Sequence, residues 1–172
     1  MDVKEAIEKR RSIRKYQDKE VSGDLIRELI DAARLAPSGL NSQPSKYLVV
    51  KDADMKNKLK ENEIFSQEFV YQAPAIIFCC ADPSAYKERS KTFDNTNETR
   101  AIRDLSIASS FLVLRATELG LGTCFVGWIN REKIFDVLDI PKEYFIPYVI
   151  TIGYPAEQPE PRSRKNIDEI LL

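Results

Sequence analysis

The densest charge in this sequence lies close to its amino terminus, where basic side chains crowd into a short segment. They are Lys9, Arg10, Arg11, Arg14 and Lys15. A second basic group lies near the carboxyl terminus, at Arg162, Arg164 and Lys165. Because a guanidinium group offers a planar fork of donors that matches phosphate oxygens, the two segments brought together would hold a phosphate dianion. Charge alone also fits a solvated face at a helix end, where basic side chains suit the helix dipole.

The overall charge argues against a polyanionic partner. The chain has 172 residues with 26 Lys and Arg against 27 Asp and Glu, so no global field draws it to nucleic acid or an anionic membrane. The basic segment is short and lacks aromatic side chains on which bases stack. No apolar run approaches the roughly 20 residues of a membrane span, and residues 1–15 lack the apolar core of a secretion signal. These features predict one cytoplasmic domain over residues 1–172, with neither a membrane nor nucleic acid as partner.

A second stretch with chemical potential, residues 36–44, reads Ala-Pro-Ser-Gly-Leu-Asn-Ser-Gln-Pro. Asn41 and Gln43 each carry a donor and an acceptor in one side chain, the pairing that a heteroaromatic ring edge with alternating C=O and N–H groups would need. An ordinary turn between a helix and a strand has the same composition for backbone reasons. Taken by itself, the segment leaves a ring-binding loop and a plain turn open.

A glycine-rich stretch, residues 120–127, invites a dinucleotide-binding interpretation that its surroundings exclude. A Rossmann loop needs GxGxxG after a strand and before a helix, whereas here the third glycine is displaced and a helix precedes a strand. The glycines would instead end the helix and let the strand backbone approach a partner closely. Cys124 is a poor candidate nucleophile, because the chain has no His to activate it.

The amino-acid counts narrow the chemistry further. The absence of His removes His-based triads, two-His zinc sites and an imidazole general base. The three cysteines, Cys79, Cys80 and Cys124, form no CxxC pair and lie in apolar runs, which favours buried, reduced thiols over a metal site. Any catalysis must therefore rest on a group other than His.

Helical and strand patterns alternate along the chain and must position these stretches. The spacing of apolar residues predicts helices from Asp2, from Ser22 to Pro37, over 53–61, over 99–119 and after Asn130. Strands are predicted over 46–51, 75–81, 123–128 and 148–153. The strand 75–81 is apolar throughout, which indicates burial on both faces. This interleaving predicts an α+β or α/β fold with one central sheet covered on both sides.

Four motifs in one order make the sequence similar to a known family. They are RRSIRKY at 10–16, APSGLNSQPSKYLVV at 36–50, LGLGTCFVGW at 119–128, and ITIGYP followed by PRSRK within 150–165. Together, and over essentially the whole chain, they resemble the nitroreductase family of FMN-dependent oxidoreductases in its short form. The resemblance implies an α+β nitroreductase-like fold of one domain, with a central mixed, mostly antiparallel sheet flanked by helices, in a homodimer with flavin sites at its interface.

The resemblance assigns a binding role to residues of each motif. The family segment that holds the FMN phosphate and ribityl chain is matched by Arg10, Arg11, Ser12 and Arg14. The basic pair that completes the phosphate site is matched by Arg162 and Arg164. The loop that reaches the flavin of the neighbouring subunit is matched by Pro37, Ser38 and Asn41, with Gln43 just beyond it. The strand whose backbone N–H groups lie near flavin N5 and O4 is matched by Phe125, Val126 and Gly127.

The resemblance also implies the chemistry. NADH or NADPH would donate hydride to flavin N5 and leave, and a small oxidised acceptor would take its place, a ping-pong sequence in which the flavin carries the chemistry. Nitroaromatics, quinones, flavins and activated alkenes are all open as acceptors, and no metal and no catalytic side chain is implied. The alternative from another class of protein is a flavin-binding carrier or sensor without turnover.

Two features depart from the family pattern. Ser45 stands where many members have a bulky aromatic residue after the Gln-Pro pair, which changes the packing expected beside the site. The long helical insertion that covers the pocket in larger relatives is absent here. Residues 82–98, with Tyr86 and Phe93, are the candidate lid, and a plain surface loop is the alternative. The apolar end of the chain, residues 167–172, is expected to add to the sheet edge of a partner subunit.

Overall fold

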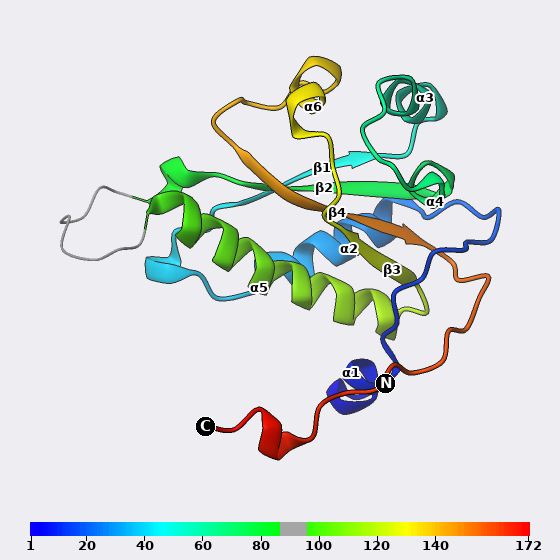
Figure 1. Ribbon diagram of the computed structural model, residues 1–172, viewed down its shortest axis with the longest axis vertical. Helices are drawn as coiled ribbons and strands as arrows, with labels where there is room; N and C mark the ends of the chain where they lie inside the picture. The colour runs from blue at the N-terminus through cyan, green and yellow to red at the C-terminus, as the bar shows by residue number, and fades with distance from the viewer. Residues whose placement is uncertain (87–95) are drawn as a thin grey trace.

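The computed structural model describes residues 1–86 and 96–172 and places a four-stranded sheet between two layers of helices (Figure 1). The strands are β1 (Ser45–Val50), β2 (Ala75–Ala81), β3 (Gly122–Val126) and β4 (Phe145–Gly153), in the order β1-β2-β4-β3. All three pairings are antiparallel. In the described part of the chain, parallel pairing is confined to an isolated bridge between Ser12 and Thr123. The predicted α+β class with a mostly antiparallel sheet is confirmed.

Strand β2 shows how the sequence builds both halves of the core. Its residues alternate between two clusters, with Ile77 and Cys79 in one and Ile76 and Phe78 in the other, and all four side chains are fully buried. The first cluster packs under helices α2 (Gly23–Arg34) and α5 (Asn97–Glu118). The second packs under α3 (Ala53–Glu61), α4 (Glu68–Gln72) and α6 (Arg131–Val137). A continuous apolar strand is thus covered on both faces, as predicted.

Helix α5 runs along one face of the sheet beside α2 (Figure 1). It begins two residues before its predicted start, because the Thr96 side chain accepts a hydrogen bond from the backbone N–H of Thr99 and caps it. Its buried stripe includes Leu105 and Leu112, both fully buried. Ile107 and Phe111, one turn apart, keep 37% and 42% of their surfaces exposed.

The two ends of the chain lie near one another below α5. Helix α1 (Val3–Lys9) starts with a capping box between Asp2 and Glu5, and the carboxyl-terminal tail passes beside it (Figure 1). A single 3-10 turn, η3 (Ile167–Glu169), interrupts that exposed tail. Two further 3-10 turns, η1 (Gly39–Asn41) and η2 (Pro83–Ala85), follow α2 and β2.

Some boundaries differ from the sequence-based expectation. Strand β4 begins at Phe145 rather than 148, because Pro147 lies opposite a register shift in the pairing with β2, and strands tolerate Pro at such irregularities. The short helix α4 was not predicted. Residues 87–95 of the candidate lid, Phe93 included, lie outside the described residues. Among the described residues, no helix is long and apolar enough to cross a membrane.

The cysteine prediction is confirmed. Cys79, Cys80 and Cys124 are free and buried. Burial raises the pKa of the Cys80 thiol to about 12, and burial raises the pKa of Cys79 further still. These thiols are therefore neutral at physiological pH and pack as small apolar groups.

Candidate functional site

The segment that follows α1 is fixed to the start of β3. The backbone N–H of Ile13 donates to the carbonyl of Thr123 at 2.9 Å, next to the bridge between Ser12 and Thr123. Ile13 is buried directly over Gly122, where an added Cβ would come within 2.7 Å of the Ile13 side chain. The close backbone approach predicted from the glycine-rich stretch is therefore made by this segment, and no larger residue fits at 122.

Arg10, Ser12 and Arg14 belong to the segment that is joined to β3 by the bridge between Ser12 and Thr123. Burial raises the pKa of Cys124 in that strand, and the positive charges of Arg14 and Arg10 oppose this rise. The Arg14 guanidinium carbon also lies 6.0 Å from the centroid of the Phe69 ring. Among the described residues, neither arginine forms an ion pair with a carboxylate. Two uncompensated cations beside a hydroxyl group suit an anionic ligand.

The other predicted phosphate ligands make different contacts. The Nη1 atom of Arg11 donates to the carbonyls of Glu8 at 2.6 Å and Arg10 at 2.9 Å, at the end of α1. Arg162 and Arg164 lie in the exposed tail, where Nη1 of Arg164 donates to the Arg162 carbonyl at 3.2 Å. The single chain therefore brings together Arg10, Ser12 and Arg14 but not these three arginines, whose phosphate role stays a prediction.

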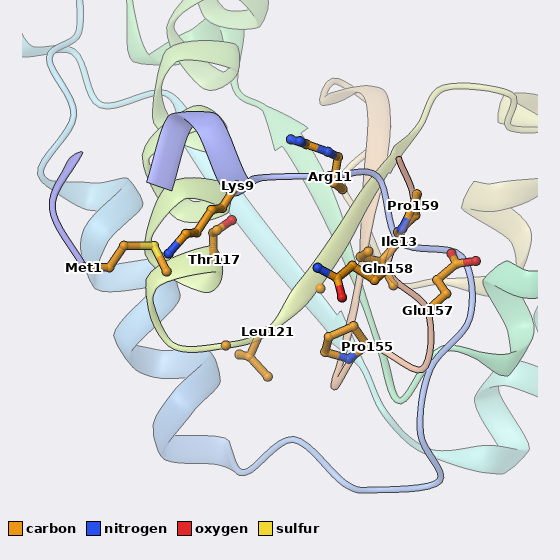
Figure 2. Close-up of a pocket in the computed structure, with 12 residues that line it drawn as sticks. Met1, Lys9, Arg11, Ile13, Thr117, Leu121, Pro155, Glu157, Gln158 and Pro159 are labelled. Carbon is orange, nitrogen blue, oxygen red and sulfur yellow. The ribbon is translucent and has the colours of Figure 1, made fainter. Parts of the chain in front are cut away.

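A cavity of about 190 Å³ lies between α1 and the strand ends, and its walls join both termini. Figure 2 shows Lys9 and Met1 on one side of it and Pro155, Glu157 and Gln158 on the other. The tail thus passes the basic segment at residue 158, a few residues before Arg162.

Glu157 ties the basic segment to the tail, and sequence reasoning missed it. Its Oε1 atom accepts hydrogen bonds from the backbone N–H groups of Arg14 at 2.6 Å and Lys15 at 3.1 Å. Two backbone bonds flank it, from Ala156 N to the Lys15 carbonyl and from Gln17 N to the Tyr154 carbonyl, both at 2.9 Å. The carboxylate thus binds main-chain donors rather than the Arg14 guanidinium, whose Nη1 donates to the Ser12 carbonyl at 3.4 Å.

The outer edge of β3 offers backbone donors next to this basic group. In an antiparallel strand the N–H and C=O of one residue point to the same side. Since the Thr123 carbonyl accepts from Ile13 and points away from β4, the N–H group of Phe125 also faces the open edge. Phe125 is 43% exposed, whereas Val126 is buried.

The Arg131 side chain fixes the turn after β3. Arg131 donates through Nη2 to the carbonyls of Gly127 at 3.2 Å and Pro147 at 2.7 Å, and through Nε to that of Ile146 at 3.0 Å. Phe125 packs edge-on against Tyr148, with ring centroids 5.1 Å apart. The open edge of β3 is therefore a fixed surface. A planar acceptor ring laid along it would meet ordered donors.

The loop over residues 37–43 packs far from this edge, on the opposite half of α5. The backbone N–H of Gly39 donates to Oδ2 of Asp104 at 2.6 Å, and that of Gln43 donates to Oγ of Ser38 at 2.9 Å. Pro37, Ser38 and Gln43 line a cavity of about 320 Å³ that also has Ser45 on its wall. Asn41 is exposed, and its side-chain amide makes no hydrogen bond to any residue that the structure describes.

The two groups of predicted ligands are well separated within one chain. The loop contacts α5 at Asp104, whereas Lys9 and Arg11 share a cavity with Thr117 of the same helix. At 1.5 Å per helical residue these two positions are about 20 Å apart along the axis. The loop and the basic segment therefore lie beside different parts of α5 within one chain.

Comparisons with known proteins find relatives over most of the chain. The sequence profile described as Nitroreductase family matches residues 7–64 and 56–154. A Methanothermobacter thermautotrophicus protein, described as a candidate NADH dehydrogenase/NAD(P)H nitroreductase, is 40% identical over 177 residues, which cover 100% of this chain and 87% of that protein.

Solved structures give the same result. A nitroreductase family protein from Clostridium difficile 630 superposes with a TM-score of 0.85 at 30% identity, covering 100% of this chain and 98% of the other. A Desulfovibrio desulfuricans protein solved in complex with FMN superposes with a TM-score of 0.83 at 30% identity, covering 100% and 96%.

Proposed function

The chain belongs to the nitroreductase family, and we propose that it uses FMN to pass electrons from NADH or NADPH to a small oxidised acceptor. The name of the Methanothermobacter relative and the FMN complex of the Desulfovibrio protein support an NAD(P)H-dependent flavin oxidoreductase. The ping-pong order and an acceptor such as a nitroaromatic or a quinone belong to the proposal. FMN, when bound, supplies the hydride acceptor and the electron store that this chain's side chains lack.

The observation that carries the proposal is the uncompensated positive charge beside an open strand edge. Arg10 and Arg14, on the segment bridged to β3, have no carboxylate partner among the described residues, whereas Arg34 and Arg115 are ion-paired. These two arginines and the Ser12 hydroxyl fit the terminal phosphate and ribityl oxygens of FMN. The donor set fits one phosphate and includes no Rossmann loop for a pyrophosphate, which favours FMN over FAD.

The remaining contacts would come from the strand edge and from a partner subunit. The N–H groups of Phe125 and Gly127 would donate to the flavin ring and favour negative charge that develops there on reduction. Asn41 is exposed on the loop that contacts α5 at Asp104, about 20 Å along the helix axis from Thr117, and it would reach the flavin of the second subunit. Its amide offers both a donor and an acceptor to the ring edge.

Exposed apolar surface supports the homodimer that such a shared site requires. Ile107 and Phe111 leave an apolar stripe on α5 open to solvent, and stable dimers cover such stripes. In the tail, Ile167, Ile170 and Leu171 are each at least 60% exposed. Within the described residues, β1 pairs on one side only, so its free edge can receive the tail of the partner.

Anaerobic stopped-flow absorbance tests the proposal. Protein loaded with FMN is mixed with NADH or NADPH, and the flavin absorbance is expected to bleach rapidly with at least one of them. Addition of 1,4-benzoquinone or nitrobenzene is then expected to restore the oxidised spectrum. A bound flavin that neither cofactor bleaches would instead indicate a carrier or sensor, and a chain that binds no FMN would overturn the proposal.

A further inference from the structure

Asp104 is an unusual residue for its position. It lies on the buried side of α5 with only 3% of its surface exposed, among side chains that are otherwise mostly apolar. Its Oδ2 atom accepts hydrogen bonds from the Gly39 N–H at 2.6 Å and from the Tyr86 hydroxyl. Its Oδ1 atom accepts from Nε of Arg103 at 3.0 Å. The carboxylate therefore joins three separate segments of the chain.

These contacts keep the carboxylate charged. Burial alone would raise the pKa of Asp104, but the hydrogen bonds from Tyr86, Gly39 and Arg103 outweigh it and hold that pKa below its usual value. Burial, followed by the bond to Asp104, raises the pKa of Tyr86 to about 12. At neutral pH the hydroxyl is therefore a donor and the carboxylate an ionised acceptor, so the bonds are charge-assisted.

The loop that Asp104 holds has an unfavourable backbone. Leu40, Asn41 and Gln43 have φ values of 57°, 55° and 51°, in the left-handed region that side chains other than Gly seldom adopt. Such residues persist only where surrounding contacts determine them. Among the described residues, two hydrogen bonds join residues 37–44 to the body of the protein, Gly39 to Asp104 and the Pro44 carbonyl to Asp82 N.

We propose that Asp104 is a positioning residue, which fixes the 37–43 loop in the conformation that presents Asn41 to the flavin of the partner subunit. The flavin contact rests on the proposed function, whereas the ordering of the loop does not. The bond to Gly39 anchors the first residue of η1, and the internal bond from Gln43 N to Ser38 Oγ closes the loop above it. Without the carboxylate, the strained segment loses one of its two anchors and relaxes.

The test compares Asp104→Asn with Tyr86→Phe in the full-length dimer. The first weakens the bond to Gly39, while the second removes the other donor to the same oxygen and leaves that bond intact. Amide hydrogen exchange at Gln43, followed by NMR without FMN, reports loop order. FMN titration reports binding. Asp104→Asn is expected to accelerate exchange and weaken FMN binding, each by about 10-fold, the loss of one charge-assisted bond. Tyr86→Phe is expected to stay within about 3-fold in both.

Gly39→Pro serves as a second variant in case Asp104→Asn does not fold. It removes the donor rather than the acceptor, and Pro suits the first position of a helical turn. Ser38 before it is already extended, with φ of −137° and ψ of 151°, as a residue before Pro requires. The same rise in Gln43 exchange and the same loss of FMN affinity are expected.

Each remaining outcome has a defined meaning. Wild-type exchange at Gln43 in Asp104→Asn would overturn the positioning role. Faster exchange with unchanged FMN affinity would overturn the flavin contact. Equal effects in Asp104→Asn and Tyr86→Phe would show that the network only stabilises the fold. A wild-type protein that binds no FMN would overturn the proposed function and the flavin contact, while the exchange rates would still decide whether Asp104 orders the loop.

Discussion

The two halves of the candidate site are held by different means. The basic half, residues 10–15, is joined to β3 and to the tail by several backbone bonds, including Ile13 N to Thr123 O and Ala156 N to Lys15 O. The loop half, residues 37–43, has a left-handed backbone at three non-Gly positions, and apart from the backbone bond at Pro44 it relies on one buried carboxylate. Backbone bonds tolerate side-chain changes, whereas a single side-chain anchor does not. Substitution of a residue that supports the basic half should therefore disturb that half little. Substitution of a residue that supports the loop should disturb the loop more.

The largest expected effect is on the dimer that would bring the two halves together. Phe111→Glu places a charge on the exposed apolar stripe of α5, and burying that charge in an interface costs several kcal/mol. We expect a monomer by light scattering with at least about 100-fold weaker FMN binding. Lys142→Glu, an exposed charge change between α6 and β4, is the control. A Phe111→Glu protein that stays dimeric would remove α5 from the interface.

The next effect concerns the ligand contacts of the basic half. Arg10→Ala and Arg14→Ala each remove a charge-assisted hydrogen bond to phosphate, which contributes about 1.5–3 kcal/mol. The FMN dissociation constant is expected to rise roughly 10- to 150-fold for each, with the thermal midpoint nearly unchanged. Arg27→Ala, an exposed arginine on α2, controls for net charge. Equal FMN titrations for all three variants would favour a solvated charged face.

A smaller effect is expected where the basic half is only supported. Glu157→Ala removes an acceptor from the backbone N–H groups of Arg14 and Lys15, but the neighbouring backbone bonds remain. We expect a loss of about 1 kcal/mol in the free energy of unfolding by urea. Exchange at the Arg14 and Lys15 amides should accelerate. If the loop is the less robust half, Asp104→Asn accelerates exchange in the loop more than Glu157→Ala accelerates it at Arg14 and Lys15. A larger disturbance from Glu157→Ala would reverse the comparison.

The smallest effect is a dependence on pH. The pKa of Tyr86 is raised to about 12 in the folded protein, above its ordinary value of 10.0. The neutral hydroxyl therefore contributes stability that is complete below pH 10 and is lost as the pH rises to about 12. Urea unfolding at pH 8 and pH 11 should show a smaller loss with pH for Tyr86→Phe than for the wild type. Identical losses would mean that Tyr86 titrates normally.

Local patterns allowed much of the fold to be predicted from the sequence. The apolar run 75–81 and the spacing of Met55 and Leu59 predicted β2 and α3 with the bounds that the structure has. Helix α4 was missed because five residues, Glu68–Gln72, carry too little periodicity. The predicted strand 148–153 is shorter than β4, because Pro147 interrupts the strand pattern near its start. Local pattern identifies elements well and their irregular ends poorly.

The candidate site was predicted less completely, for a physical reason. The basic cluster and the glycine-rich strand lie within short windows, and the structure joins the segment of Arg10, Ser12 and Arg14 to that strand. Glu157 binds amides more than 140 positions earlier, and nothing local marks it. Asp104 did leave a signal, since an acidic residue interrupts the buried stripe of α5. A charge on an apolar helix face predicts a partner from another segment.

Subunit complementation tests the shared site most directly. One chain would carry Arg10→Ala with Arg14→Ala, and the other Asn41→Ala with Asp104→Asn, so that each homodimer binds FMN weakly. In a heterodimer of the two, one site combines all four changes and the other has none, provided that the loop reaches across the interface. We therefore expect the purified heterodimer to bind one FMN with wild-type affinity. A heterodimer that binds FMN no better than either homodimer would mean that each chain completes its own site.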